Sequence, residues 1–203
     1  MLPTLAFPAP RWAFAPRDPL AFDPARDEDA SWVVAARHGD AEAFDELVRR
    51  HAARLHAVAR RLVGPGDAPD AVQECLMTAY QGLPRFRGDA RFSTYLHAIL
   101  VRQCRRKARR LARSLPWPDG EMASGDPGPV EHAERREVQR QVARAVARLP
   151  APYREALVLR ETAGLEYRDV ARALGVPIGT VRSRIARARE RLREAFERDG
   201  VAP

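Results

Sequence analysis

The segment YRDVARALGVPIGTVRSRIARAR, residues 167–189, decides how this chain is interpreted. Apolar residues recur in it at spacings that let two short helices close on each other, namely Val170, Leu174, Val176, Val181 and Ile185. Gly175 suits the left-handed conformation that ends a first helix, and Pro177 suits the start of a second, where no N–H is needed. The pattern predicts a helix-turn-helix, a module whose second helix lies in the DNA major groove.

The second helix of this motif is strongly basic. Between residues 182 and 193 it has six arginines and only one acidic residue, Glu190. The arginines are Arg182, Arg184, Arg187, Arg189, Arg191 and Arg193. Guanidinium groups bind phosphates and guanine edges through paired N–H groups, so this composition suits DNA. The alternative is an ordinary helical hairpin with a solvated basic face. Apolar register, turn chemistry and charge agree, and they favour DNA binding.

The composition of the whole chain points to a polyanionic partner. The 203 residues are enough for one or two domains, and 45% of them are hydrophobic. Lys and Arg outnumber Asp and Glu by 35 to 27, which leaves a formal net charge of +8. That excess predicts binding to nucleic acid or to an anionic membrane surface. No apolar run approaches the ~20 residues that span a bilayer, and prolines interrupt the N-terminus, so we expect a cytoplasmic protein.

Cysteine and histidine give no sign of a metal or cofactor. The chain has no CxxC pair, and its five histidines lack metal-ligand spacing. We therefore expect no cofactor and no metal. Cys75 and Cys104 are expected to be reduced and buried as small apolar side chains, with a regulatory disulfide between them as the alternative.

Prolines divide the chain into segments. They are dense in 1–27, expected to be a disordered arm or a partner-binding segment, and in 114–130, expected to be a flexible linker. Apolar stripes of helical period fill 28–113 and 131–198. In the first of these domains, the stripe from Phe44 to Leu62 ends at Gly64, Asp67 can cap the next helix, Pro84 stops it, and a long helix covers 92–113. The predicted fold is all-α, with two small helical domains and a helix-turn-helix in the second.

An aromatic and basic loop leads into the long helix. Phe86, Phe92 and Tyr95 precede seven cations with no acid among residues 102–113, namely Arg102, Arg105, Arg106, Lys107, Arg109, Arg110 and Arg113. Aromatic rings can stack on unpaired bases while cations follow the backbone, which predicts contact with single-stranded DNA. The alternative places the rings in the core and the arginines on a solvated face.

Asp70 and Glu74 lie at i and i+4 on one helix face, with Gln73 adjacent. No nucleophile, histidine or third ligand accompanies them, so catalysis and metal binding have no support. An acidic patch on a basic protein suits a docking surface for another protein, with a merely solvated face as the alternative.

Taken together, these motifs resemble the extracytoplasmic-function group of bacterial sigma-70 factors. The resemblance rests on residues 39–64, on DAPDAVQECLMTAY at 67–80, on LPRFRGDARFSTYL at 83–96 and on residues 147–195. It covers the chain except for the arm and the linker. It implies a protein that is not an enzyme and has no small-molecule substrate. Its partners would be core RNA polymerase, promoter DNA and an anti-sigma factor.

The resemblance also implies roles for particular residues. The first domain would be a sigma region 2 that docks on the β′ clamp helices through Asp70, Gln73 and Glu74. It would melt and recognise the −10 element through Phe86, Arg87, Gly88, Asp89, Phe92, Ser93, Thr94, Tyr95, Arg102, Arg105 and Arg106. The second would be a sigma region 4 that contacts the β flap and reads the −35 element through Thr180, Arg182, Ser183, Arg184 and Arg187.

Two departures from the family pattern and three rival interpretations accompany the resemblance. Tyr95 stands where the family usually has tryptophan, and residues 101–110 are more basic than usual, which bears on the −10 sequence preference. The main rival is a stand-alone helix-turn-helix regulator that binds duplex DNA, which would leave the first domain without a task. A hydrolase lacks a nucleophile and base, and a membrane-surface helix lacks a bulky apolar face.

Overall fold

The computed structural model describes residues 27–114 and 131–198, and this part of the chain folds entirely into helices and loops, without strands. The predicted all-α class is therefore confirmed. The first domain contains α1 (Ala30–Arg37), α2 (Ala41–Val63), α3 (Ala68–Gly82), a 3-10 turn at Leu83–Arg85 and α4 (Phe92–Ser114). The second contains α5 (Glu131–Arg148), α6 (Ala151–Glu161), α7 (Tyr167–Leu174) and α8 (Ile178–Arg198). The arm and nearly all of the linker lie outside the described residues.

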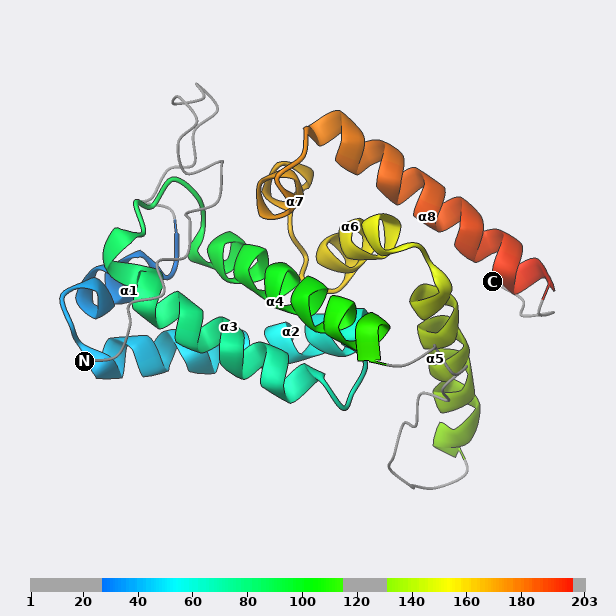
Figure 1. The fold of residues 1–203 in the computed structure, drawn as a ribbon, viewed down its shortest axis with the longest axis horizontal. Coiled ribbons are helices and arrows are strands. Elements are labelled where there is room, and N and C mark those ends of the chain that lie inside the picture. The colour runs from blue at the N-terminus through cyan, green and yellow to red at the C-terminus, as the bar shows by residue number, and fades with distance from the viewer. Residues whose placement is uncertain (1–26, 115–130, 199–203) are drawn as a thin grey trace.

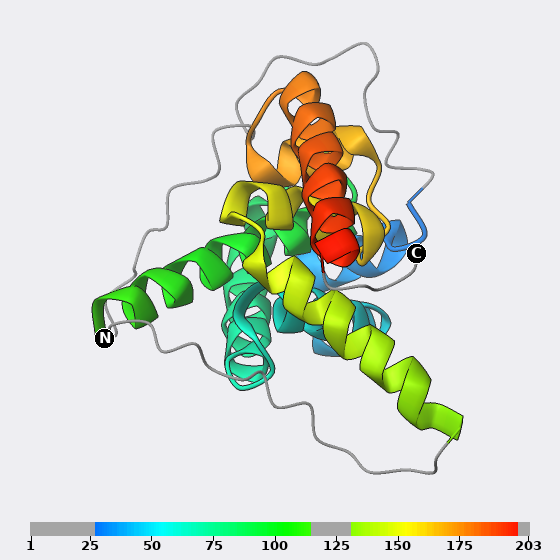
Figure 2. The ribbon, with the colours of Figure 1, turned by 90° about the vertical axis from the view of Figure 1, so that its right-hand side faces the viewer.

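Helix α4 occupies the middle of the molecule. It packs against α2 and α3 on one side and against α7 on the other. Figure 1 shows this arrangement, with α6 and α7 lying above α4 and with α8 outermost. In the turned view of Figure 2, α5 extends away from the body while α8 stands over α6. A single helix therefore supplies packing surface to both domains.

The first domain follows its apolar stripes. Asp40 begins α2, where its Oδ1 accepts the N–H of Ala43 at 3.0 Å, and Gly64 ends the helix with a φ of 85°. Four of the stripe residues are buried, namely Leu47, Leu55, Val58 and Leu62. The predicted helices are thus present, and their buried faces form the core as the periodicity indicates.

Two local features differ from the sequence prediction. Asp67 does stand at the N-cap of α3, but within the described structure its side chain makes no capping hydrogen bond. Its carboxylate instead lies 3.6 Å from Nζ of Lys107 on α4. The sequence pattern also gave no separate helix at α1, because eight residues are too few for a clear apolar period.

The turn between α7 and α8 forms as predicted. Gly175 has φ 67° and ψ 38°, and the N–H of Val176 donates to the carbonyl of Ala171 at 3.1 Å. This is the hydrogen-bond pattern of a helix that ends on a left-handed residue. Val181 and Ile185 of α8 are fully buried, so the two helices close on each other as the apolar spacing indicates.

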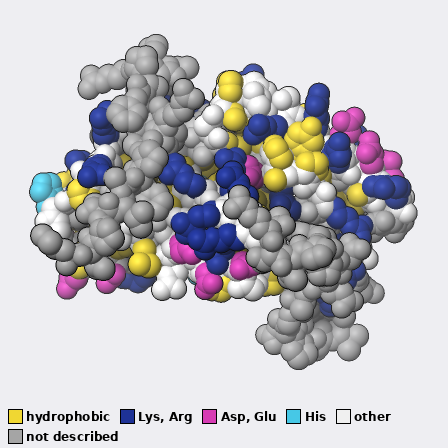
Figure 3. Space-filling view, in the orientation of Figure 1, with side chains coloured by type: hydrophobic (Ala, Val, Ile, Leu, Met, Phe, Trp, Pro, Cys, Tyr) yellow, Lys and Arg dark blue, Asp and Glu magenta, His cyan; other side chains and the backbone are white. Residues whose placement is uncertain are grey.

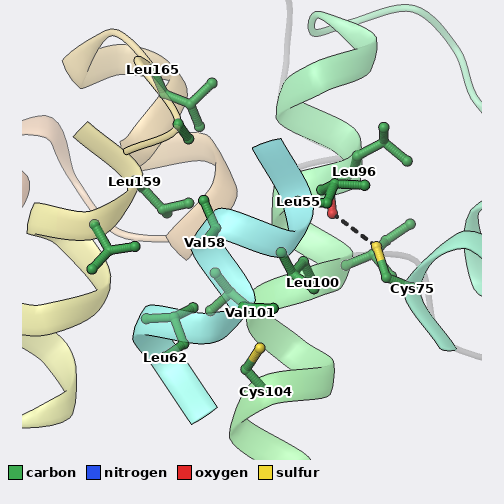
Figure 4. Packing of buried hydrophobic residues seen from close by; sticks show 14 of the residues in the cluster. Leu55, Val58, Leu62, Cys75, Leu96, Leu100, Val101, Cys104, Leu159 and Leu165 are labelled. Atoms are coloured by element: carbon green, nitrogen blue, oxygen red, sulfur yellow. Dashed lines mark hydrogen bonds between the residues drawn. The ribbon is translucent and has the colours of Figure 1, made fainter. Parts of the chain in front are cut away.

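The two domains share one hydrophobic core, which the sequence did not predict. Figure 4 shows Leu159 of α6 beside Val58 of α2, with Leu62 and Val101 nearby in the same cluster. Val58 and Leu159 are each 0% exposed. A contact between helices so distant in sequence leaves no local signature, because each apolar stripe only requires some partner.

Both cysteines are free thiols in buried positions, as expected. Sγ of Cys75 donates to the carbonyl of Leu96 at 3.4 Å, which ties α3 to α4 (Figure 4). Burial raises the pKa of the Cys104 thiol to about 12, so the thiol is protonated and unreactive in this arrangement. Among the helices in the described residues, none is long and apolar enough to cross a membrane.

Gly175 and Gly179 form a matched pair for testing the turn. A Cβ on either would meet no atom within 4 Å, but only Gly175 has a positive φ. We expect Gly175→Ala to lower the free energy of unfolding by about 1–2 kcal/mol, since left-handed backbone is unfavourable for alanine. Gly179→Ala lies in α8 and should be neutral or stabilising by up to about 1 kcal/mol. Urea unfolding followed by circular dichroism measures both, and equal destabilisation would exclude a role for backbone conformation.

Candidate nucleic-acid interface

The N-terminal half of α8 has a buried side and a polar side. Val181, Ile185 and Ala188 are buried against the domain. The predicted DNA-reading residues lie on the remaining surface, with Arg182, Ser183 and Arg187 exposed and with Thr180 and Arg184 half-buried. The structure therefore gathers all five on one exposed stretch of a helix that begins at Ile178.

Neighbouring side chains hold some of the α8 arginines and leave others unpaired. Nη1 of Arg187 lies 3.5 Å from the hydroxyl of Tyr153, and the guanidinium of Arg191 lies 5.5 Å from the centroid of the same ring. Arg189 pairs with Glu161 at 2.7 Å. Arg182 makes no hydrogen bond or ion pair with any residue that the structure describes, so its guanidinium is free to reach a base edge.

Tyr153 is a residue of this interface that the sequence did not single out. The hydrogen bond and positive charge of Arg187, together with Arg191 and Arg184, lower the pKa of its hydroxyl. The same hydrogen bond raises the pKa of Arg187. Tyr153 lies 34 residues before Arg187, so only the packing of α6 on α8 reveals that it orients this arginine.

The aromatic residues of the loop form a packed cluster. The ring of Phe86 lies 4.8 Å from Tyr95 and 6.0 Å from Phe92, measured between centroids. Phe86 is 7% exposed and Phe92 is 1% exposed. In this arrangement protein covers the faces of these two rings, so they could stack on bases only after moving, and their role in stacking stays a prediction.

Tyr95 is held in the same cluster. Its hydroxyl donates to the carbonyl of Ala79 at 3.3 Å, and burial raises its pKa to about 12. Thr94 is fully buried, and Ser93 is half-buried with its carbonyl 2.7 Å from Nδ1 of His97. These residues secure the start of α4 rather than face solvent.

The exposed residues of the predicted −10 set include the tip of the loop and, on α4, Arg102. Arg87 and Asp89 are exposed, and Gly88 between them has a φ of 73°, which allows the tight reversal. The predicted set is thus divided into exposed polar residues on the loop and a buried aromatic base beneath it.

Two aspartates before α1 secure this loop, and the sequence gave no sign of them. Oδ2 of Asp27 accepts the N–H of Phe92 at 3.1 Å, which caps the start of α4. Oδ2 of Asp29 lies 2.7 Å from Nε2 of His51. Burial works against the charge of Asp29, but His51 and Arg50 outweigh it and lower its pKa. The separation of 65 residues between Asp27 and Phe92 explains why no local pattern predicted the cap.

The acidic face of α3 is paired with the basic face of α4. Glu74 forms an ion pair with Arg106, and Asp70 lies 3.1 Å from Nζ of Lys107. Figure 3 shows blue side chains directly beside magenta ones in the middle of this view. Gln73 and most of the Asp70 side chain, at 69% exposure, remain open to solvent. The predicted docking residues and the predicted −10 arginines are therefore one continuous network.

Arg105 differs from the other α4 cations, because its partner belongs to the second domain. Its Nε and Nη2 donate to the two carboxylate oxygens of Glu155 at 2.8 and 2.6 Å. Glu155 is 6% exposed, and this hydrogen bonding raises the pKa of Arg105. Arg102, one helical turn earlier, is exposed.

The chemistry that these surfaces support is binding. No cluster of His, Cys, Asp or Glu in residues 27–114 or 131–198 could hold a metal ion. His97 is 1% exposed, and burial lowers its pKa to about 4, so it is neutral at pH 7. Besides the carboxylates of Asp70 and Asp89, the exposed groups include guanidinium, hydroxyl and amide groups, which are groups that contact phosphates and base edges.

Comparisons with known proteins agree with this division into two parts. Residues 47–114 match the family model of Sigma-70 region 2, and residues 139–192 match that of Sigma-70, region 4. The chain is 42% identical over 166 residues to the ECF RNA polymerase sigma factor SigM of Mycobacterium tuberculosis, which covers 81% of this chain and 82% of that protein. It is 35% identical over 173 residues to the ECF RNA polymerase sigma-E factor of Escherichia coli, covering 80% and 91% respectively.

Solved structures give the same result for the fold. The structure of CnrH in complex with the cytosolic domain of CnrY matches with a TM-score of 0.67 and 29% identity, over 85% of this chain and 99% of that one. The sigma factor RpoE of Bartonella quintana, solved with the anti-sigma factor NepR, matches with a TM-score of 0.61 and 27% identity, over 76% and 96% respectively.

The contribution of Arg182 to base reading can be measured directly. A duplex that the protein prefers would be selected from random sequences, and binding compared with that of an unselected duplex. We expect Arg182→Ala to weaken binding to the selected duplex by about 1–3 kcal/mol, because one base-reading pair is lost. Binding to the unselected duplex should change much less.

Arg198→Ala is the matched control, since Arg198 is exposed at the far end of α8 and bonds only to the carbonyl of Glu194 among the described residues. An equal loss on both duplexes for Arg182→Ala would show that it contacts phosphate and does not read bases.

Proposed function

This chain belongs to the extracytoplasmic-function group of RNA polymerase sigma-70 factors, and we propose that it divides promoter recognition between two surfaces. The polar face of α8 reads the −35 element, and the loop at residues 86–91 with α4 engages the −10 element. The exposed face of α3 docks on core polymerase. The observation that carries this proposal is the presence, in one chain and in this order, of an exposed acidic α3 face and a basic recognition helix within the two matched regions.

The −35 assignment is supported by the geometry of α8. Thr180, Arg182, Ser183, Arg184 and Arg187 share the exposed stretch at its N-terminal half, the part of a recognition helix that contacts base edges. Arg182 is unpaired within the described structure, while Tyr153 orients Arg187. The arginines nearer the C-terminus are placed to contact phosphate and fix the orientation of the helix.

The −10 assignment is supported by the exposed loop and by the cations that follow it. Arg87 and Asp89 project from a loop whose base is fixed by the cluster of Phe86, Phe92 and Tyr95. A fixed base matters because unpaired bases bind best to groups that are already positioned. Melting costs about 1–2 kcal/mol per base step in lost stacking, and polymerase must help to supply it. The isolated chain should therefore open DNA poorly.

The docking assignment is supported by the surface chemistry of α3. Asp70 and Gln73 are exposed, and Met77 and Tyr80 on the same helix are 56% and 49% exposed. An acidic end next to an apolar end suits a protein partner, since exposed apolar residues gain from burial. We assign this face to the β′ clamp helices and the second domain to the β flap.

Further features of the proposal follow from family membership. The chain acts by binding and not by catalysis, and it acts in the cytoplasm, where polymerase and DNA meet. An anti-sigma factor is a further proposed partner. Support comes from RpoE of Bartonella quintana, which was solved with an anti-sigma factor. A stand-alone regulator would account for α8 but not for the exposed face of α3.

Transcription with purified core polymerase tests the proposal. The chain should confer initiation at defined start sites on genomic DNA, and core polymerase alone should give none. Sequencing the transcripts would supply the −10 and −35 elements. Failure to initiate at any specific site, combined with duplex binding by the chain alone, would favour the stand-alone regulator.

Charge reversal on α3 tests the docking surface separately. Asp70→Arg should weaken binding to core polymerase at least tenfold, since like charges replace complementary ones at the interface. Asp45→Arg is the control, because Asp45 is also exposed but lies on α2. Both Asp70 and Glu74 pair with a cation of α4, but the Asp70 side chain is 69% exposed against 34% for Glu74, so a reversed Asp70 side chain can turn away from Lys107 into solvent and Asp70 is the better test site. Competition binding with labelled protein measures the affinity, and full retention by Asp70→Arg would exclude this face.

A further inference from the structure

The two domains are packed too closely to hold both promoter elements at once. The −10 and −35 elements are about 25 base pairs apart, which is about 85 Å of B-form DNA. Helix α4 has 23 residues and is therefore about 35 Å long. Yet α7, the first helix of the helix-turn-helix, packs directly on α4. A chain that reads both elements must first separate these helices.

We infer that this packed arrangement is a closed resting state, held by the Arg105–Glu155 ion pair, in which the chain is unable to engage both elements of a promoter. The inference rests on the proposed function, because it takes the −10 and −35 roles as given. Opening breaks the pair, separates α6 and α7 from α2 and α4, and frees the α4 surface for DNA.

The ion pair has the properties of a latch. Both oxygens of Glu155 are occupied by Arg105, and the carboxylate is 6% exposed. With Nε and Nη2 directed at the carboxylate, Arg105 keeps only its remaining N–H groups for a phosphate and its charge is balanced by Glu155, so the closed state weakens one of the proposed −10 cations. Removal of Arg105 would leave the buried Glu155 carboxylate without the partner that bonds both of its oxygens.

Apolar contacts support the same closed state. Val58 and Leu159 lie side by side in the seam and are each 0% exposed (Figure 4). Opening exposes them, which disfavours the open state until another surface covers them. Near the start of α4, α7 packs on the same helix and its Asp169 is 3% exposed.

The chain contains natural reporters for each event. Cys104 adjoins Arg105 and is 3% exposed. The charges of Glu155 and Arg154 on α6 affect the pKa of its thiol. Cys75 is 0% exposed within the first domain and bonds to Leu96. Seam opening should therefore expose Cys104 while leaving Cys75 protected, whereas unfolding of the first domain exposes both.

The test uses the full chain with Glu155→Arg, Arg105→Glu and the double exchange. Alkylation by iodoacetamide, read by peptide mass spectrometry, follows each thiol, and small-angle X-ray scattering follows the size of the protein. Glu155→Arg should raise the rate at Cys104 by about tenfold or more, since like charges then face each other in the seam. Its radius of gyration should rise, and the rate at Cys75 should stay at the wild-type value.

Glu161→Arg is the matched control, because it breaks the Arg189–Glu161 pair inside the second domain and leaves the seam intact. The double exchange should return the Cys104 rate and the size towards wild type. Wild-type values of both quantities in Glu155→Arg would overturn the closed state. Failure of the double exchange to restore them, or equal reactivity at Cys75, would overturn the latch. Transcription with core polymerase reports the proposed function independently of these measurements.

Discussion

The burial of α4 on two sides is the constraint on which the rest of the structure depends. Residues 96–101 of this helix are buried without interruption, although an amphipathic surface helix buries only about every third or fourth residue. Continuous burial requires partners on opposite sides, and α2 with α3 and α7 supply them. The position of the second domain therefore depends on its packing against the first domain's central helix.

The same helix also determines how many of the charged side chains are paired. Beyond residue 101, α4 becomes basic, and three of its cations are matched by acids from other helices. Arg105 meets Glu155, Arg106 meets Glu74, and Lys107 meets Asp70. A helix with this density of positive charge repels itself, and the acids reduce that repulsion. The consequence for function is that the proposed −10, docking and interdomain surfaces are electrostatically connected, so that a change at one affects the others.

The buried aromatic cluster explains how the proposed −10 loop can be exposed at its tip and still be held in a fixed position. Phe86, Phe92 and Tyr95 fill the space beneath the loop, while Asp27 caps the helix that follows it. Rings that are packed in this way could stack on bases only after moving, but they fix where Arg87 and Asp89 stand. A rigid base under a polar tip reduces the entropy lost on binding an unpaired strand.

The sequence by itself determined the helical class, the limits of most helices and the helix-turn-helix with its left-handed Gly175. These depend on interactions within a few residues, such as the apolar period and turn chemistry. Its apolar spacing also predicted that Val181 and Ile185 of α8 are buried, which leaves Arg182, Ser183 and Arg187 on the exposed side, and their contact with DNA stays a prediction. Only the tertiary structure decided what Tyr153, Asp27 and Glu155 do, which rings of the −10 loop are buried, and that the two domains share a core. Each of these rests on contacts between residues far apart in the chain. The local sequence pattern shows that an apolar or charged side chain needs a partner, but it does not show which distant residue that partner is.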